Sequence, residues 1–239
     1  MTPTTGKRLA IRLARLTAAV LCAALLSNGA ATAQGMLAQG NFWALETILR
    51  PMIVRNPDII GRQDELLNDP ASPVGGNPDG DVTLVELFDY QCLYCKTIFP
   101  SIQELLAEDR KLRFVFKEIP ILGTDSVFAA RAALAARRQG KYLEFQLTLM
   151  PARGKLTETR VMRLAETVGL DVDRLRRDMA ERTIGDMIRR NLELADALGI
   201  DGTPAFIIGD TQVPGAVEID TLKTLIARAR QRGTSGKVQ

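Results

Sequence analysis

The sequence has no histidine among its 239 residues, and it has only three cysteines and one tryptophan. The absence of histidine excludes serine–histidine hydrolysis. A structural zinc site needs about four ligands, and the chain has no histidine and no third cysteine beyond residue 33. No glycine-rich loop of the phosphate-binding kind occurs either. These absences leave the remaining cysteine pair as the leading candidate for chemistry.

The chain also lacks a large excess of charge, because its formal net charge is only +3. Four cations stand at the N-terminus ahead of an apolar run at residues 16–26: Lys7, Arg8, Arg12 and Arg15. That run is short for a membrane span, and the small-x-small tripeptide at residues 31–33 is typical of a cleavage site. Residues 1–33 are therefore predicted to be a signal peptide cleaved near Ala33, with an uncleaved membrane anchor as the alternative.

Loss of residues 1–33 would remove four positive charges and no negative one, so the formal charge of +3 would become −1. The basic character thus belongs to the targeting segment and gives no support for a nucleic-acid partner. Cys22 lies inside the apolar run, and the residue before it, Leu21, is too large for a lipoprotein site. We expect Cys22 to be discarded, which leaves Cys92 and Cys95 in an exported, periplasmic protein where disulfides can form.

One stretch near the middle of the chain joins a strand pattern to a helix pattern. An apolar, β-prone run at residues 82–88 is followed by residues 89–91 and then by a Cys-x-x-Cys pair. Apolar residues then recur at spacings of three and four, which are typical of a helix: Ile98, Ile102, Leu105 and Leu106. The sequence therefore predicts that the cysteines lie where a strand turns into a helix.

Cys92 and Cys95 are spaced to lie on one face of the first helical turn, within reach of a disulfide. Cys92 comes first, where unpaired backbone N–H groups and the helix dipole favour a thiolate. A thiolate is the nucleophile of disulfide exchange. Cys95 lies one turn deeper and suits the resolution of a mixed disulfide. A redox centre is favoured over the two alternatives, a structural disulfide or half of a zinc site.

Residues 87–96, Leu-Phe-Asp-Tyr-Gln-Cys-Leu-Tyr-Cys-Lys, resemble the active-site segment of the DsbA-like thiol–disulfide oxidoreductases. Three later segments extend the resemblance, at residues 117–123, 126–133 and 202–209, so that it covers about residues 68–232. The chain is most similar to the subgroup with an extra N-terminal segment, which includes the ScsC-type isomerases. The resemblance implies an α/β thioredoxin fold with an inserted α-helical subdomain, preceded by a helical extension.

The resemblance also implies roles for residues outside the cysteine pair. Thr203 and Pro204 match the family's cis-proline loop, which binds substrate backbone beside the first cysteine. Leu93 and Tyr94, between the cysteines, are implied substrate contacts. Glu86 matches the buried acid of thioredoxin-like folds, which would have a raised pKa and relay a proton for the second cysteine.

Two further expectations concern the strand residues around this acid. The apolar neighbours of Glu86 favour burial over an alternative in which it faces solvent at the sheet edge. An approach of Lys117 to Glu86 across the sheet is one arrangement that the sequence allows.

The expected organisation follows the chain in order. Residues 1–33 are the signal peptide, 34–77 a helical extension and linker, and 78–124 the first part of the thioredoxin fold. Residues 125–199 form the inserted helical subdomain, and 200–239 the second part with a C-terminal helix. In the extension an apolar stripe has helical spacing: Phe42, Leu45, Leu49 and Met52. The resemblance implies that such an extension drives self-association into a homo-oligomer, and the alternative is that the stripe packs on its own domain.

The expected function is exchange, formation or isomerisation of disulfides in secreted proteins. Protein thiols or disulfides would be the substrates, and a membrane redox partner would reoxidise or reduce the centre. No cofactor is required, because the disulfide itself carries the two electrons. Strongly oxidising relatives often carry histidine where this chain has Tyr94, so oxidase, isomerase and reductase all remain open. A Cu(I)-binding or chaperone-like module is the alternative of a different class, since two thiolates can hold Cu(I).

Overall fold

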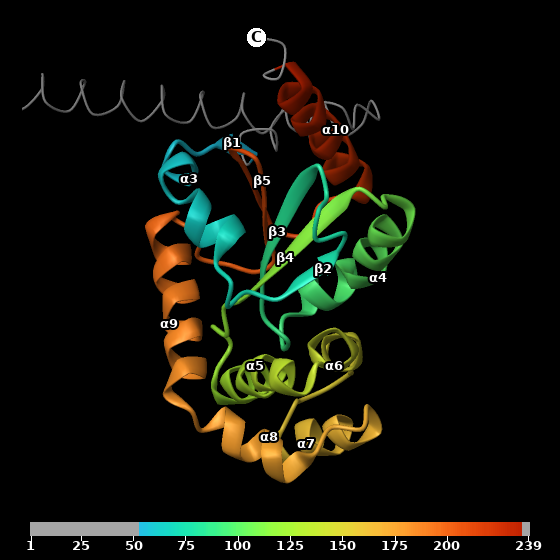
Figure 1. Ribbon diagram of the computed structural model, residues 1–239, viewed down its shortest axis with the longest axis vertical. Helices are drawn as coiled ribbons and strands as arrows, with labels where there is room; N and C mark the ends of the chain where they lie inside the picture. The colour runs from blue at the N-terminus through green and yellow to red at the C-terminus, as the bar shows by residue number, and fades with distance from the viewer. Residues whose placement is uncertain (1–52, 236–239) are drawn as a thin grey trace, which may run out of the picture. The chain divides into compact units, whose positions relative to one another are not determined.

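A six-stranded mixed sheet lies at the centre of the computed structural model, which describes residues 53–235 (Figure 1). The strand order is β1-β6-β5-β3-β4-β2. β3 and β4 are parallel, and all other neighbours are antiparallel. The strands are β1 (Val54–Arg55), β2 (Val74–Gly76), β3 (Val82–Phe88), β4 (Leu112–Glu118), β5 (Ala205–Ile208) and β6 (Thr211–Pro214). The predicted signal peptide, Cys22 and the stripe at residues 42–52 lie outside the described residues.

Alternation along β3 divides its side chains between two cores, as expected for a strand covered on both faces. Leu84 and Phe88 pack with α4 (Leu93–Glu108) and α10 (Ile219–Ser235). Val85 and Leu87 lie in the second core, which α9 (Arg182–Ala197) covers together with two single turns, α3 (Asp58–Gly61) and η2 (Asp64–Asn68). Figure 1 shows α4 and α10 on one side of the sheet and α3 and α9 on the other.

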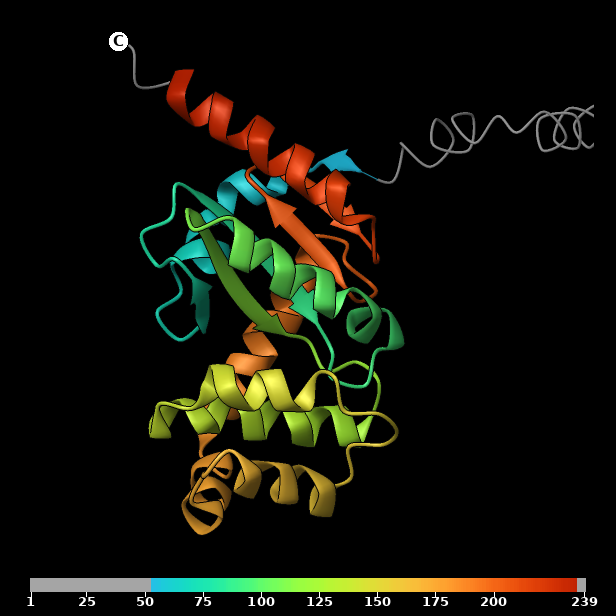
Figure 2. The ribbon, with the colours of Figure 1, turned by 90° about the vertical axis from the view of Figure 1, so that its right-hand side faces the viewer.

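The helices between β4 and β5 form the inserted subdomain that the sequence predicts. They are α5 (Thr124–Ala136) with a short 3₁₀ turn η3 (Arg137–Gln139), α6 (Tyr142–Leu149), α7 (Glu158–Thr167), α8 (Val172–Met179) and α9. The alanine-rich α5 is central and contacts α6, α7, α8 and α9, since small side chains let helices approach closely. α5 and α6 lie side by side beyond one end of the sheet (Figure 2).

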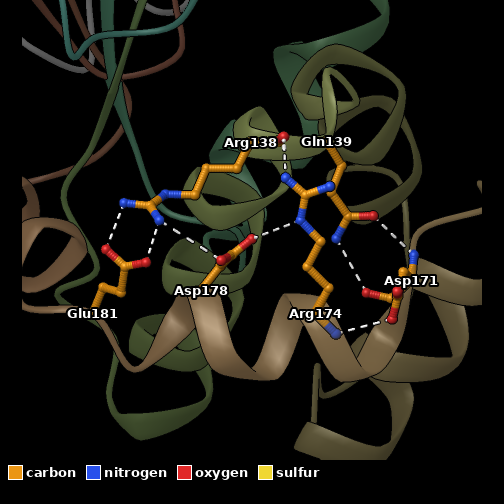
Figure 3. A network of polar contacts seen from close by, with 6 residues as sticks. All are labelled: Arg138, Gln139, Asp171, Arg174, Asp178 and Glu181. Carbon is orange, nitrogen blue, oxygen red and sulfur yellow. Dashed lines mark hydrogen bonds and ion pairs between the residues drawn. The ribbon is translucent and has the colours of Figure 1, made fainter.

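A polar network ties the end of α5 and η3 to α8 (Figure 3). Arg138 pairs with Glu181 and lies 3.7 Å from Asp178. Arg174 donates to the Arg138 carbonyl at 2.9 Å. Asp171 is the N-cap residue of α8, and its carboxylate accepts from the Arg174 backbone N–H at 2.9 Å. Exposed ion pairs contribute only about 0–1 kcal/mol each, so we expect the Arg138–Glu181 pair to add little to the subdomain's stability.

Part of the segment 34–77, expected to be a helical extension and linker, is a strand of the sheet. β2 pairs antiparallel with β4, and Gly76 opposes Arg113 in the register. Gly76 has φ of +64°, and a Cβ there would lie 2.5 Å from the Leu112 carbonyl oxygen. Only glycine fits that close approach, and sequence pattern alone does not reveal the pairing. Within residues 53–235, no helix is both long and apolar enough to span a bilayer.

Candidate active site

The cysteine pair opens α4, as the sequence predicts. Cys92 is the N-cap residue of the helix, with extended backbone angles, and its sulfur accepts from the backbone N–H of Cys95 at 3.5 Å. Both cysteines are free thiols. Cys92 is 5% exposed and Cys95 is 1% exposed, so the first sulfur lies nearer the surface than the second. The helix start therefore directs its unpaired N–H groups toward the sulfur of Cys92.

The loop before β5 brings Thr203 and Pro204 to the cysteines. The Cys92 Sγ lies 3.1 Å from the Thr203 carbonyl oxygen, across 111 residues of sequence. The Thr203–Pro204 peptide bond is cis, in agreement with the expectation from the family resemblance. Pro204 is buried, and Thr203 is only half-buried. The Thr203 backbone therefore flanks the more accessible sulfur, where a second polypeptide has room to approach.

Hydrogen bonds lower the pKa of Cys92 to about 5. The Cys95 thiol is the largest cause, and the Thr203 side chain and the backbone N–H groups of Cys95 and Tyr94 add to it, against the effect of partial burial. Each of these groups donates to a thiolate, which favours the charged form. The Thr203 carbonyl can accept only while Cys92 keeps its proton, so that oxygen does not favour the thiolate. Cys92 is thus ionised at neutral pH.

Cys95 shows the opposite behaviour, and its pKa is raised far above the ordinary range. Its hydrogen bond to Cys92 is the first cause, followed by burial and by the negative charge of Glu86. A thiol that donates to a neighbouring thiolate keeps its proton. The pair therefore shares one charge, which resides on Cys92.

Glu86 lies beneath the cysteines on β3, and it is 5% exposed. Its side chain points to the same sheet face as Leu84 and Phe88, which pack against α4. Burial raises its pKa to about 8, and the charge of Cys92 adds to the shift. The interpretation that Glu86 is buried is confirmed, and at neutral pH the protonated form predominates.

Lys117 does not approach Glu86, and that expectation is wrong. In the parallel register Lys117 pairs with Leu87, so it points to the opposite face of the sheet from Glu86. There it is 1% exposed, its Nζ donates to Ser72 Oγ at 2.7 Å, and it lies 3.9 Å from Asp69. The β3–β4 register determines which sheet face Lys117 occupies, and this register cannot be read from the sequence.

A second buried carboxylate, Glu118 on β4, lies on the same sheet face as Glu86. The sequence pattern was not used to predict it. It is buried, its carboxylate accepts from the Tyr142 hydroxyl, and its backbone carbonyl accepts from Asn191 at 3.1 Å. Burial raises the pKa of Glu118 to about 7, although the bond from Tyr142 opposes the shift. Alternation with Phe114 and Phe116 along β4 is the signal that could have placed Glu118 on this face.

Asp89 fixes the turn that leads from β3 into the cysteine pair. Its carboxylate accepts from the Gln91 N–H at 2.7 Å, from the Leu122 N–H at 3.0 Å and from the Ser126 hydroxyl at 2.7 Å. These bonds join the strand end to the loop before α5 and to α5 itself. The position of the Cys92 backbone therefore depends on contacts with the inserted subdomain.

An apolar surface surrounds the cysteine pair. Leu93 and Tyr94 are 72% and 65% exposed, although both belong to the first turn of α4. Ile121 and Leu122 are also exposed, on the loop that Asp89 anchors. Large exposed apolar side chains at a reactive centre are typical of a surface that contacts other polypeptides. The predicted substrate contacts Leu93 and Tyr94 are thus free to make such contacts.

Residues 83–227 match the family model of the DSBA-like thioredoxin domain. The solved thioredoxin-like oxidoreductase from Silicibacter pomeroyi is 50% identical, with a TM-score of 0.69, and the match covers 71% of this chain and 98% of that one. ScsC from Proteus mirabilis is 25% identical with a TM-score of 0.68, and the match covers 93% of this chain and 99% of that one. The chain belongs to the DsbA-like family of thioredoxin-fold thiol oxidoreductases, with ScsC-type proteins among its structural neighbours.

Some curated relatives are much longer than this chain and match it over only part of their length. A Na(+)/H(+) antiporter NhaA from Salinispora tropica is 31% identical over 170 residues, which are 69% of this chain and 26% of the antiporter. The chain thus spans about a quarter of the length of the first curated relatives that it matches.

Proposed function

We propose that this protein is a thiol–disulfide oxidoreductase that exchanges disulfides with exported proteins. The observation that carries the proposal is the opposite shift of the two cysteine pKa values, downward to about 5 for Cys92 and upward for Cys95. Disulfide exchange needs one thiolate that attacks and one thiol held in reserve. A structural disulfide needs no such asymmetry.

The proposed reaction begins at Cys92. In the reducing direction its thiolate attacks a substrate disulfide, a mixed disulfide forms, and one substrate thiolate leaves. Cys95 then loses its proton and attacks the Cys92 sulfur, which releases the second substrate thiolate and leaves the Cys92–Cys95 disulfide. Two electrons pass from the enzyme to the substrate, and the reverse sequence oxidises a substrate dithiol. No cofactor takes part in either direction.

Glu86 is proposed to take the proton from Cys95 during resolution. The carboxyl group lies beneath the cysteines, and its pKa of about 8 makes it a base and an acid near neutral pH. While Cys92 is a thiolate, its charge keeps Glu86 protonated. Formation of the mixed disulfide removes that charge, so Glu86 loses its proton more readily at the step that requires a base.

Thr203 and Pro204 are proposed to hold substrate backbone beside Cys92, and Leu93 and Tyr94 to contact substrate side chains. An extended segment could pair with Thr203 as an added strand. Two observations support this placement: Thr203 is only half-buried, and its carbonyl oxygen lies 3.1 Å from the Cys92 Sγ. The exposed apolar side chains between the cysteines support contact with unfolded chains, which expose apolar surface.

Export to the periplasm, a membrane redox partner and self-association remain proposals. The N-terminal sequence pattern supports export. The structural similarity to ScsC over 93% of this chain supports a related role in thiol–disulfide exchange. No cation stands between the cysteines to add to the hydrogen bonds that stabilise the Cys92 thiolate, and the direction of exchange is therefore the subject of the experiment that follows.

Recovery of ribonuclease from two starting forms tests the proposal. The oxidised protein should reactivate reduced ribonuclease if it is an oxidase, and the reduced protein should reactivate scrambled ribonuclease if it is an isomerase. Cys92→Ser should abolish both activities. The controls are that the protein is folded and that Cys92 reacts with small disulfides. If both controls hold and neither assay shows activity, a role in protein disulfide exchange is contradicted.

A further inference from the structure

The loop between α6 and α7 is tied at both ends to the residues that flank the cysteine pair. On one side, Lys96 Nζ donates to the Met150 carbonyl at 2.9 Å and to the Ala152 carbonyl at 2.8 Å. On the other side, the Leu156 N–H donates to Gln91 Oε1 at 3.3 Å. Gln91 directly precedes Cys92, and Lys96 directly follows Cys95. The loop therefore spans the start of α4, next to the reactive sulfur.

The part of this loop between its two ties is exposed and basic. Arg153, Gly154 and Lys155 are all exposed. Arg160, from the first turns of α7, donates to the Arg153 carbonyl and, at 3.4 Å, to the Lys155 carbonyl, so the loop has a defined shape. Glu158 is the single carboxylate among residues 150–160. We call Arg153, Lys155 and Arg160 the basic loop.

Lys96 lies between the basic loop and the cysteine pair in its electrostatic contacts. Burial lowers the pKa of Lys96 and the charge of Arg160 lowers it further, whereas Cys95 and Cys92 raise it. Lys96 therefore interacts electrostatically both with Arg160 and with the two cysteines. The remaining side of Cys92 is apolar, with Leu93, Tyr94 and Leu122 exposed. A substrate that reaches Cys92 therefore meets cations on one side and apolar surface on the other.

Charge complementarity then indicates which substrates this centre attacks fastest. A disulfide with nearby carboxylates is repelled by the Cys92 thiolate in water, because the encounter joins two negative charges. Cations placed beside the thiolate offset that repulsion and raise the local concentration of anionic substrates. Cationic disulfides are repelled by the same groups. The effect is on the association rate and weakens with salt.

We propose that the basic loop is a specificity-determining surface, which selects disulfide substrates with carboxylates next to the reactive sulfur. This inference rests on the proposed function, and it adds the substrate class. The step itself is unchanged: the Cys92 thiolate forms a bond to one sulfur of the anionic disulfide, the substrate S–S bond breaks, and the other sulfur leaves as a thiolate. Arg153, Lys155 and Arg160 hold the carboxylates and take no part in electron transfer.

Small disulfides of different charge test the inference without an unknown protein substrate. The reduced full-length protein would be mixed with oxidised glutathione, which is anionic, with cystamine, which is cationic, and with bis(2-hydroxyethyl) disulfide, which is neutral. Stopped-flow rates at low and high salt would be compared between the wild type and Arg153→Glu/Lys155→Glu. The rates of a free model thiol with the same reagents correct for their intrinsic reactivity.

A matched control uses two arginines outside the loop. Arg177 on α8 and Arg228 on α10 are exposed, and Arg177→Glu/Arg228→Glu changes the net charge by the same amount. We expect the loop variant to lower the ratio of anionic to cationic rates by roughly tenfold at low salt and by much less near 1 M salt. We expect the control to change this ratio less than twofold, and neither variant to change the neutral rate appreciably.

Each outcome of the experiment bears on one proposal. An unchanged ratio in the loop variant, with an unchanged neutral rate as proof of an intact centre, would overturn the basic loop as a selector. An equal change in the control would assign the effect to net charge and would also overturn it. Failure of the wild type to react even with the neutral disulfide would instead overturn the proposed function itself.

Discussion

Cys92 and Cys95 stand one helical turn apart in α4, yet their surroundings shift their pKa values in opposite directions. The sulfur of Cys92 faces backbone N–H groups at the helix start and the Thr203 loop. The sulfur of Cys95 faces the interior, where Glu86 lies beneath it on β3. The comparison shows that the Cys-x-x-Cys spacing is compatible with a redox pair. The groups around each sulfur determine which cysteine is the thiolate and which keeps its proton.

The two buried carboxylates of the same sheet face extend this comparison. Glu86 and Glu118 lie on adjacent parallel strands, and burial raises both pKa values. Glu118 accepts a hydrogen bond from Tyr142, which lies on α6 of the inserted subdomain. Glu86 interacts instead with the charge of Cys92. Only Glu86 is therefore coupled to the redox centre, and Glu118 joins the sheet to the helical subdomain.

Exchange of either cysteine gives the largest expected effect. Cys92→Ser should reduce disulfide exchange to the background rate, because no other thiolate reaches the substrate. Cys95→Ser should accumulate mixed disulfides on Cys92, since no thiol remains to resolve them. Non-reducing gels of the two variants check this. Reductant-sensitive adducts on Cys92→Ser would show that Cys95 is the attacking thiol. The absence of adducts on a folded and reduced Cys95→Ser would contradict the role of Cys92 as the attacking thiol.

Alkylation should separate the two thiols by their ionisation. With a pKa of about 5, Cys92 should react with iodoacetamide at a nearly constant rate above pH 6. Its rate should fall about tenfold for each pH unit below 5, as the thiolate fraction falls. Cys95 should react only after unfolding. Peptide mapping after brief labelling gives the readout, and preferential labelling of Cys95 would contradict the comparison.

Glu86→Gln should stabilise the oxidised protein at pH 7 by about 1–3 kcal/mol. The carboxyl pKa is raised from 4.5 to about 8 on folding. Below pH 4.5 both states are protonated and no difference arises. Above pH 4.5 the unfolded state ionises while the folded state keeps its proton, so stability falls as pH rises and levels off above the folded-state pKa of Glu86. The disulfide removes the Cys92 charge, which leaves burial as the cause.

Denaturation midpoints at several pH values measure this effect, and the variant should lose the decline in stability that the wild type shows. The variant should also resolve mixed disulfides more slowly, because the proton acceptor is gone. A variant that is less stable at pH 7 and equally fast in resolution would identify Glu86 as a favourably ionised group with no part in the reaction.

Tyr142→Phe should have the smallest effect and leave the redox centre unchanged. Loss of its hydroxyl removes the hydrogen-bond donor to Glu118, which should cost about 1 kcal/mol of stability. The pKa of Glu118 should rise further above about 7, because the hydroxyl opposes the effect of burial. The pH profile of Cys92 alkylation should not move. A shifted profile would show that Glu118, like Glu86, is coupled to the cysteines.

Local sequence features were sufficient for the strand and the helix that flank the cysteine pair, but not for β2. The strand before Cys92 and the helix after it follow from the β-prone apolar run and from the spacing of the apolar residues. The helices between β4 and β5 agree with the inserted helical subdomain that the family resemblance implies. The placement of Pro204 beside Cys92 came from family resemblance, because residues so far apart in the chain leave no local signal of their contact.

The sequence by itself determined where a thiolate can form, because a cysteine at a helix start meets N–H donors that belong to the same short segment. Only the tertiary structure decided which charged side chains surround it. The β3–β4 register sent Lys117 to the far face and brought Glu118 to the near one. The inserted subdomain folded back so that Lys96 and Gln91 hold the loop of Arg153 and Lys155 beside the cysteines. Side-chain direction alternates at every strand residue, and contacts between distant segments depend on the packing of the whole domain.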